Sequence, residues 1–235
     1  MSVVVDRPRG PVTTVLLDRP HRHNALDAAT VDALHEVFAA ASDSGARAVV
    51  LGSSRAGMFC SGADLRIDDA ERALVSDRLY ELYATMIQLP VPIVAAVDGA
   101  AVGGGVQLVL AADVRYGSRH AALRLAGPGH GLAVGLWGLP SAVGRGAAMH
   151  LALSGRSLNA EEAHRLGLLE ELEDDPLAAA EALARGVVDL DPDAVARAKA
   201  AVVRGERLGE RLAEERAGNR AVFTGAVPPR ATGGR

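Results

Sequence analysis

The sequence predicts an α/β core followed by a helical C-terminal end. Before about residue 155, short runs rich in Val, Ile and Ala alternate with segments whose apolar residues recur at helical spacing, and after it helical patterns dominate. The length of 235 residues suits one large domain with an appended helical end. We place the core at residues 1–175, a helical C-terminal region at 176–224 and a tail without apolar periodicity at 225–235.

The first part of the chain predicts strands and helices in alternation. Residues 3–5 and 12–17 indicate two short strands joined by a turn-prone segment, and 46–51 indicates a third. Residues 27–41 have apolar side chains at helical spacing, whereas 57–64 is typical of a glycine-containing loop. A second helix follows, with one apolar face between Val75 and Ile87, and Pro90 and Pro92 end it.

The stretch 92–107 is the most informative part of the sequence. A run of Ile, Val and Ala predicts a buried strand, and three glycines, 103–105, lead into an apolar helix. Glycine lets the backbone approach a ligand closely, and a helix that begins there presents free N–H groups at the positive end of its dipole. The pattern therefore predicts a corner that binds an oxyanion. Three residues past Gly104 stands Gln107, an amide rather than a carboxylate.

The remainder predicts two short strands and several capped helices. The strands are expected at 114–116 and 121–125, and the glycine-rich segment 127–146 is expected to form an active-surface loop that runs into a helix. Asn159 with Glu162 has capping-box spacing, while Asp175 and Asp191 each precede a proline at the first helical position. From 191 the helical pattern extends to about residue 220.

Composition narrows the function classes. The net charge is −4, and no basic stripe with interleaved aromatic residues is present, so we expect neither nucleic acid nor a membrane surface as a partner. A single cysteine, Cys60, excludes an internal disulfide framework and indicates a reducing compartment. With no apolar leader or long apolar span, we expect a cytoplasmic protein. We expect no metal, because the sequence contains no cluster of metal-ligand residue types.

Four motifs occur in order and together resemble the enoyl-CoA hydratase/isomerase (crotonase) family over residues 10–175. They are Arg19-Pro20 with Asn24-Ala25-Leu26, then residues 59–65, then 92–107 with Asp113, and lastly 154–156 with 160–163 and 167–169. Each motif alone is weak, but the joint pattern is specific. The resemblance implies a spiral of ββα turns, a C-terminal region that builds homotrimers or dimers of trimers, and an acyl-CoA thioester ligand. Coenzyme A would then be part of the ligand, with no permanently bound cofactor.

The resemblance also implies site residues. The two backbone N–H groups that hold the thioester oxygen map to Ala63 and Gly104, where preorganised donors would stabilise an enolate. The loop after Ala63 is expected to line the path of the coenzyme, and charge alone makes Arg19 a further candidate to meet its phosphates. The implied coenzyme-binding residues are Arg22, His23, Ala25, Ala63, Asp64, Leu65, Arg66 and Gly104.

The sequence departs from the family at both catalytic glutamates. Gln107 occupies the first position, and local alignment puts Gly127 at the second. Glutamine does not titrate and glycine supplies only space, so we expect classical hydration to be slow. His130 is a candidate replacement proton carrier, with an ordinary loop histidine as the alternative.

Three other side chains have a functional and an ordinary interpretation. Arg124 could bind a carboxylate on the acyl group or be a surface charge, and Trp137 could wall an acyl tunnel or pack in the core. Cys60 could take part in the site or be a small buried apolar residue.

Three hypotheses follow. The chain could be a hydratase/isomerase-type enzyme with an unusual proton carrier, a non-catalytic acyl-CoA binding or carrier protein in fatty-acyl metabolism, or a structural subunit. The intact oxyanion motifs favour the first two. The closing C-terminal segment typical of the family is missing, which bears on assembly.

Overall fold

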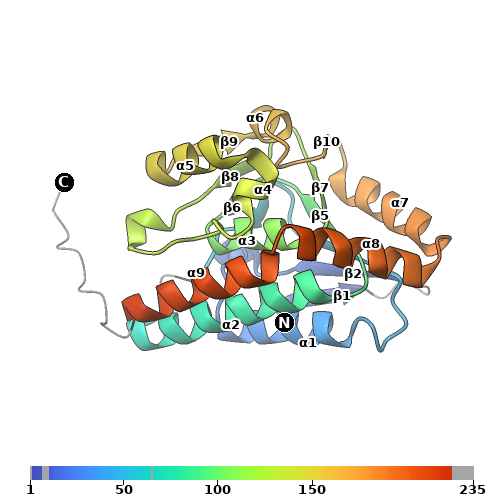
Figure 1. Ribbon diagram of the computed structural model, residues 1–235, viewed down its shortest axis with the longest axis horizontal. Coiled ribbons are helices and arrows are strands. Elements are labelled where there is room, and N and C mark those ends of the chain that lie inside the picture. Colours follow the sequence, from blue (N-terminus) through green and yellow to red (C-terminus); the bar gives the residue numbers. More distant parts are fainter. Residues whose placement is uncertain (1, 7–10, 65, 224–235) are drawn as a thin grey trace.

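A six-stranded sheet forms the centre of the protein (Figure 1). A computed structural model describes residues 2–6, 11–64 and 66–223. Only the β1–β2 pair is antiparallel, and the other neighbours are parallel, as helical crossovers between strands require. In spatial order the strands are β1 (Val3–Asp6), β2 (Val12–Leu17), β3 (Ala48–Ser53), β5 (Ile93–Val97), β7 (Val114–Gly117) and β10 (Glu171–Leu172).

A second sheet of four short strands lies beside the first. Its order is β4 (Met58–Cys60), β6 (Ala100–Val102), β8 (Ala122–Arg124) and β9 (Ser157–Asn159). From β3 to β8, successive turns of the chain therefore place one strand in the large sheet, the next in the small sheet, and then a helix. The prediction of a loop over 57–64 is wrong for β4, which pairs with β6. Three residues are too few to produce a readable strand pattern.

In the described part of the chain, six α-helices precede the C-terminal region, and a side chain caps the start of three of them, including the predicted cap at Asn159. The Asp27 side chain accepts a hydrogen bond from Thr30 N at the start of α1, and Asn159 accepts one from Glu162 N at the start of α6. The helices are α1 (Ala28–Ala40), α2 (Asp69–Gln88), α3 (Gly104–Ala111), α4 (Leu139–Val143), α5 (Arg145–Ser154) and α6 (Ala160–Arg165).

The C-terminal region contains three helices, α7 (Pro176–Val188), α8 (Pro192–Gly205) and α9 (Leu208–Phe223). The predicted caps at Asp175 and Asp191 are confirmed. The helical pattern predicted from 191 to about 220 is confirmed, and it forms two helices because Arg207 adopts a left-handed conformation with φ 55° and separates α8 from α9. The reversal lays α9 along α2 (Figure 1). There Arg216 donates two hydrogen bonds to the carboxylate of Asp77, one from Nε and one from Nη2, each at 2.7 Å.

A buried ion pair ties α8 to the central sheet. The Lys199 ammonium lies 2.8 Å from Asp113 and donates hydrogen bonds to the carbonyls of Met86 and Val91, each at 3.1 Å. Asp113 in turn accepts a hydrogen bond from Ile93 N, at the start of β5. The Lys199 ammonium thereby has three acceptors, as a buried charge requires. Asp113, at the corner between α3 and β7, therefore has a structural role.

Candidate functional site

The site is built on a close approach between the loop after β4 and the start of α3. A parallel bridge holds this loop, because Leu26 N donates to Gly62 O at 2.8 Å and Asp64 N donates to Leu26 O at 3.0 Å. Gly62 has φ +88°, and a Cβ there would lie 2.6 Å from Val102 O. Only glycine combines that backbone conformation with so close a contact.

The approach brings two free donors together at the start of α3. Among the described residues no acceptor is found for the N–H of Ala63 or of Gly104. Gly104 is the first residue of α3, so its N–H lies at the positive end of the helix dipole. A Cβ on Gly104 would lie only 3.6 Å from Ala63 N. Paired N–H groups without partners are suited to stabilise an oxyanion.

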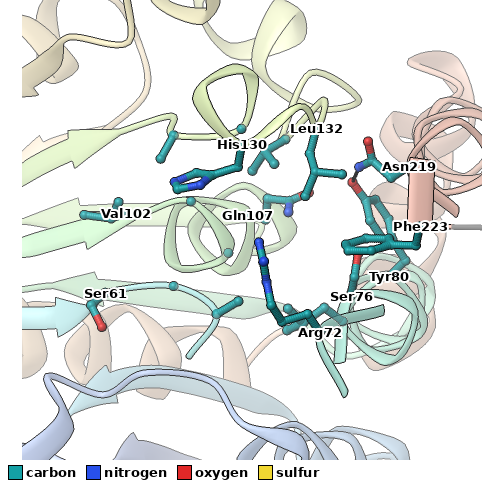
Figure 2. Close-up of a pocket in the computed structure, with 18 residues that line it drawn as sticks. Ser61, Arg72, Ser76, Tyr80, Val102, Gln107, His130, Leu132, Asn219 and Phe223 are labelled. Carbon is teal, nitrogen blue, oxygen red and sulfur yellow. Dashed lines mark hydrogen bonds between the residues drawn. The ribbon is translucent and has the colours of Figure 1, made fainter. Parts of the chain in front are cut away.

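Both donors belong to the wall of one cavity of about 140 Å³ (Figure 2). The predicted site residues Ala63, Gly104, Gln107, Gly127 and His130 all line it. Most of the remaining wall is apolar, from Leu79, Val102, Leu132, Val134 and Phe223. An apolar cavity with a few convergent polar groups is the usual form of a small-molecule site.

Gln107 has a structural role in this wall. Its side-chain oxygen accepts hydrogen bonds from Gly135 N at 3.2 Å and from the Trp137 indole nitrogen at 3.0 Å, which occupies both lone pairs. Trp137 is buried and stacks on Tyr83 with ring centroids 6.4 Å apart. Trp137 is not among the cavity residues, so the interpretation as a tunnel wall is wrong and core packing is correct.

Gly127 occupies a position with no room for a side chain. A Cβ there would lie 2.6 Å from Val134 Cγ2 and 2.7 Å from Leu132 O. The described residues that line the cavity include neither Asp nor Glu. Neither Gln107 nor Gly127 therefore supplies a carboxylate to the cavity, and at Gly127 the loop conformation leaves no room for one.

Of the other candidate side chains, His130 lines the cavity, whereas Cys60 and Arg124 do not. His130 ends a short 3₁₀ turn, is exposed, and presents its ring at the cavity (Figure 2). Burial raises the pKa of the Cys60 thiol to about 12, and the thiol donates to Asn24 O, so Cys60 is a buried structural residue. Arg124 donates from Nε to Gly155 O at 2.9 Å, is exposed, and does not line the cavity.

Sequence reasoning missed the contribution of α9 to the site. The Glu215 carboxylate accepts hydrogen bonds from Gly135 N at 2.8 Å, Trp137 N at 2.9 Å and the Tyr80 hydroxyl at 2.7 Å. Burial raises the pKa of Glu215. Asn219, one turn further on, lines the cavity and donates to the Tyr80 hydroxyl at 2.7 Å. No local pattern announces these contacts, because they join residues about 80 to 140 positions apart.

Among the described residues that the resemblance implies for coenzyme binding, Ala63 and Gly104 line the cavity and the others do not. The Arg19 guanidinium pairs with Asp27 at 2.8 Å and donates to Ala25 O, so it is engaged within the loop. Asp64 accepts a hydrogen bond from Arg66 N at 3.1 Å, which holds the loop locally. The side chains of Arg22, His23 and Arg66 are exposed, and Leu65 lies outside the described residues. Their contact with a coenzyme stays a prediction.

Two further predictions concern absences. Within the described ranges, none of the helices combines the length and apolar character that a membrane crossing needs. In the same part of the chain, no three His, Cys, Asp or Glu side chains gather as a metal site would require.

Comparisons with known proteins agree on one family. Residues 8–228 match the enoyl-CoA hydratase/isomerase family model. The "Probable enoyl-CoA hydratase echA6" of Mycobacterium bovis is 38% identical over 191 residues, which are 80% of this chain and 77% of that protein.

Solved structures give the same result. The crystal structure of an enoyl-CoA hydratase/isomerase from Mycobacterium paratuberculosis has a TM-score of 0.86 and 28% identity, covering 94% of this chain and 93% of that one. A monofunctional enoyl-CoA isomerase from M. smegmatis has a TM-score of 0.75 and 32% identity, covering 88% and 94%. These likenesses confirm the predicted crotonase-like spiral.

Proposed function

Since the chain belongs to the enoyl-CoA hydratase/isomerase family, we propose that it binds an acyl-CoA thioester and holds the carbonyl oxygen between the N–H groups of Ala63 and Gly104. The single observation that carries this proposal is the pairing of two N–H groups, both without an acceptor among the described residues, at the wall of one cavity. Donors of this kind bind a carbonyl and stabilise the enolate that forms from it.

We further propose that classical hydration is impaired. Adding water to an enoyl thioester needs a group that positions the water and groups that transfer protons. Gln107 already uses its oxygen on Gly135 and Trp137, and Gly127 has no space for a side chain. Losing acid–base assistance typically costs about 10²- to 10⁴-fold in rate. Incubation with trans-2-butenoyl-CoA, followed by the ultraviolet absorbance of the enoyl thioester, is expected to show slow or no turnover.

A thioether analogue tests the carbonyl site directly. Calorimetric titration would compare hexanoyl-CoA with S-hexyl-CoA, which has the same coenzyme and nearly the same chain but no carbonyl oxygen. One or two N–H bonds to the oxygen correspond to roughly a 2- to 100-fold preference for the thioester. Titration with free coenzyme A measures the affinity of the coenzyme without an acyl group. Equal affinities for thioester and thioether would refute the proposed carbonyl site.

Proton transfer by His130 is the second candidate function, and the position of its ring at the cavity favours it. An enolate held by Ala63 and Gly104 would exchange the α-protons of a saturated acyl-CoA with solvent. Incubation in D₂O, with mass spectrometry of the recovered thioester, would detect that exchange. Exchange that disappears in His130→Ala indicates an enzyme with His130 as proton carrier. Tight binding without exchange indicates a non-catalytic acyl-CoA binding protein.

A further inference from the structure

We propose that the cavity selects acyl groups that carry a carboxylate, and that Arg72 of α2, assisted by Ser76, binds that carboxylate. This inference rests on the proposed function, because it concerns the acyl group of the same thioester. It assigns a substrate class, the CoA esters of dicarboxylic acids, and it gives Arg72 a role that the sequence motifs did not suggest.

The first support for this inference is the placement of the Arg72 and Ser76 side chains. Arg72 and Ser76 are four residues apart on α2, so they lie on one face of the helix, and both line the cavity. Figure 2 shows the Arg72 side chain extending from α2 toward the middle of the cavity, with Gln107 beyond it. A planar guanidinium donates two parallel hydrogen bonds to a carboxylate, and a serine hydroxyl adds a third donor.

The charges around the cavity favour an anion. Arg72 and His130 are basic, and no Asp or Glu is among the described residues of the wall. Two acidic side chains of the neighbouring helices have partners of their own: Asp77 accepts hydrogen bonds from Arg216 and Arg220, and Glu215 accepts them from backbone N–H groups. Because the rest of the wall is mainly apolar, the field of a cation there is weakly screened.

The structure thereby moves a predicted role to another residue. From the sequence, Arg124 was the candidate to bind a carboxylate of the acyl group, but its guanidinium binds Gly155 O outside the cavity. Arg72 has the same chemistry and lines the cavity that also holds Ala63 and Gly104. A single ligand can therefore contact the paired N–H groups with its thioester oxygen and Arg72 with its distal carboxylate.

Chain-matched ligands test the inference on the unmodified protein. Calorimetry would compare succinyl-CoA with pentanoyl-CoA, glutaryl-CoA with hexanoyl-CoA, and adipoyl-CoA with heptanoyl-CoA. A charge-assisted, bidentate contact predicts that at least one dicarboxylic ester binds roughly 10- to 100-fold more tightly than its partner. If all six bind and each pair binds equally, the inference is wrong while the proposed function stands. If none binds more tightly than free coenzyme A, the proposed function fails as well.

Variants then assign the preference to Arg72. Arg72→Gln is expected to abolish the preference for the dicarboxylic ester within each pair, whereas Arg72→Lys keeps the charge and is expected to keep part of that preference. Arg78→Gln is the matched control, because Arg78 lies on the same helix but pairs with Asp32 away from the cavity. If Arg72→Gln weakens free coenzyme A and every ester alike, Arg72 binds a coenzyme phosphate and the inference is overturned. Thermal unfolding of each variant verifies that it is folded.

Discussion

The indole Nε1 of Trp137 donates a 3.0 Å hydrogen bond to the side-chain oxygen of Gln107, in the interior of the protein. The same oxygen accepts a bond from Gly135 N, so the residue at a family catalytic position also fastens the loop that follows Gly127. A side chain that faces the cavity is thereby coupled to the core. Gln107 therefore has a structural role at a position where its side chain cannot transfer protons.

Gln107→Leu is expected to destabilise the protein, because the Trp137 indole N–H then has no acceptor. A buried donor without a partner costs about 1–3 kcal/mol in the free energy of unfolding. Urea unfolding followed by the fluorescence of Trp137, which is the only tryptophan, measures the change. Gln88→Leu, at an exposed position near the end of α2, is the control and is expected to change stability little. Equal effects of the two substitutions would contradict the assignment.

Gly127→Ala is expected to destabilise the loop, because the added Cβ would lie 2.6 Å from Val134 Cγ2 and 2.7 Å from Leu132 O. Overpacking of this kind costs about 1–3 kcal/mol. Gly129→Ala is a matched control in the same turn, since a Cβ there meets nothing within 4 Å. Differential scanning calorimetry should show a lower melting temperature for the first variant only. The same clash means that installing glutamates at positions 107 and 127 together should not restore hydration unless the loop rebuilds.

Glu215→Gln is expected to loosen the loop from Gly135 to Trp137. The two carboxylate oxygens accept bonds from both of these N–H groups, whereas an amide offers one oxygen and a second group that is itself a donor. We expect a loss of about 1–3 kcal/mol in unfolding free energy. Acyl-CoA affinity should fall too, because α9 supplies Asn219 and Phe223 to the cavity. Glu214→Gln, at the exposed neighbouring position, should leave both quantities unchanged.

The contact between α2 and α9 should depend on pH through Asp77. Hydrogen bonds from Arg216, with a further contribution from Arg220, hold the pKa of Asp77 at about 2, below its ordinary value of 3.8. A lowered folded-state pKa gives stability that is fully present above 3.8 and is lost as the pH falls toward 2, where the folded protein also takes up the proton.

Asp77→Asn is therefore expected to lower stability at pH 7 by about 1 kcal/mol, the upper end for solvent-screened ion pairs. The difference from wild type should shrink between pH 4 and 2, as urea unfolding at a series of pH values would reveal. Asp32→Asn is the control. It removes the ion-pair partner of Arg78, and because Asp32 is more exposed than Asp77, the loss of stability should be smaller. If the difference in unfolding free energy between wild type and Asp77→Asn instead grows as the pH falls, the expected pH dependence is wrong.

Much of the fold could be read from local chemistry. The buried run 93–97 predicts a central strand because every residue in it is apolar, and the structure buries all five. Asn159, Asp175 and Asp191 predict helix starts because a short polar side chain can satisfy a backbone N–H within its own turn. Such signals lie within a few residues of one another, so the sequence alone can carry them. The motifs at 59–65 and 92–107 likewise placed the two donors of the site, while trimeric assembly stays a prediction.

Other features depend on contacts that no local pattern contains. The sequence by itself determined most element types and the family, and it predicted the pair of N–H groups at Ala63 and Gly104, because these depend on neighbouring residues. Only the tertiary structure decided that Arg207 reverses the chain and that Arg72 rather than Arg124 lines the cavity. The same holds for α9, where Glu215 binds the loop at Gly135 and Asn219 lines the cavity. The physical reason is that the direction of a side chain and the space around it are set by segments distant in the chain, which come together only on folding.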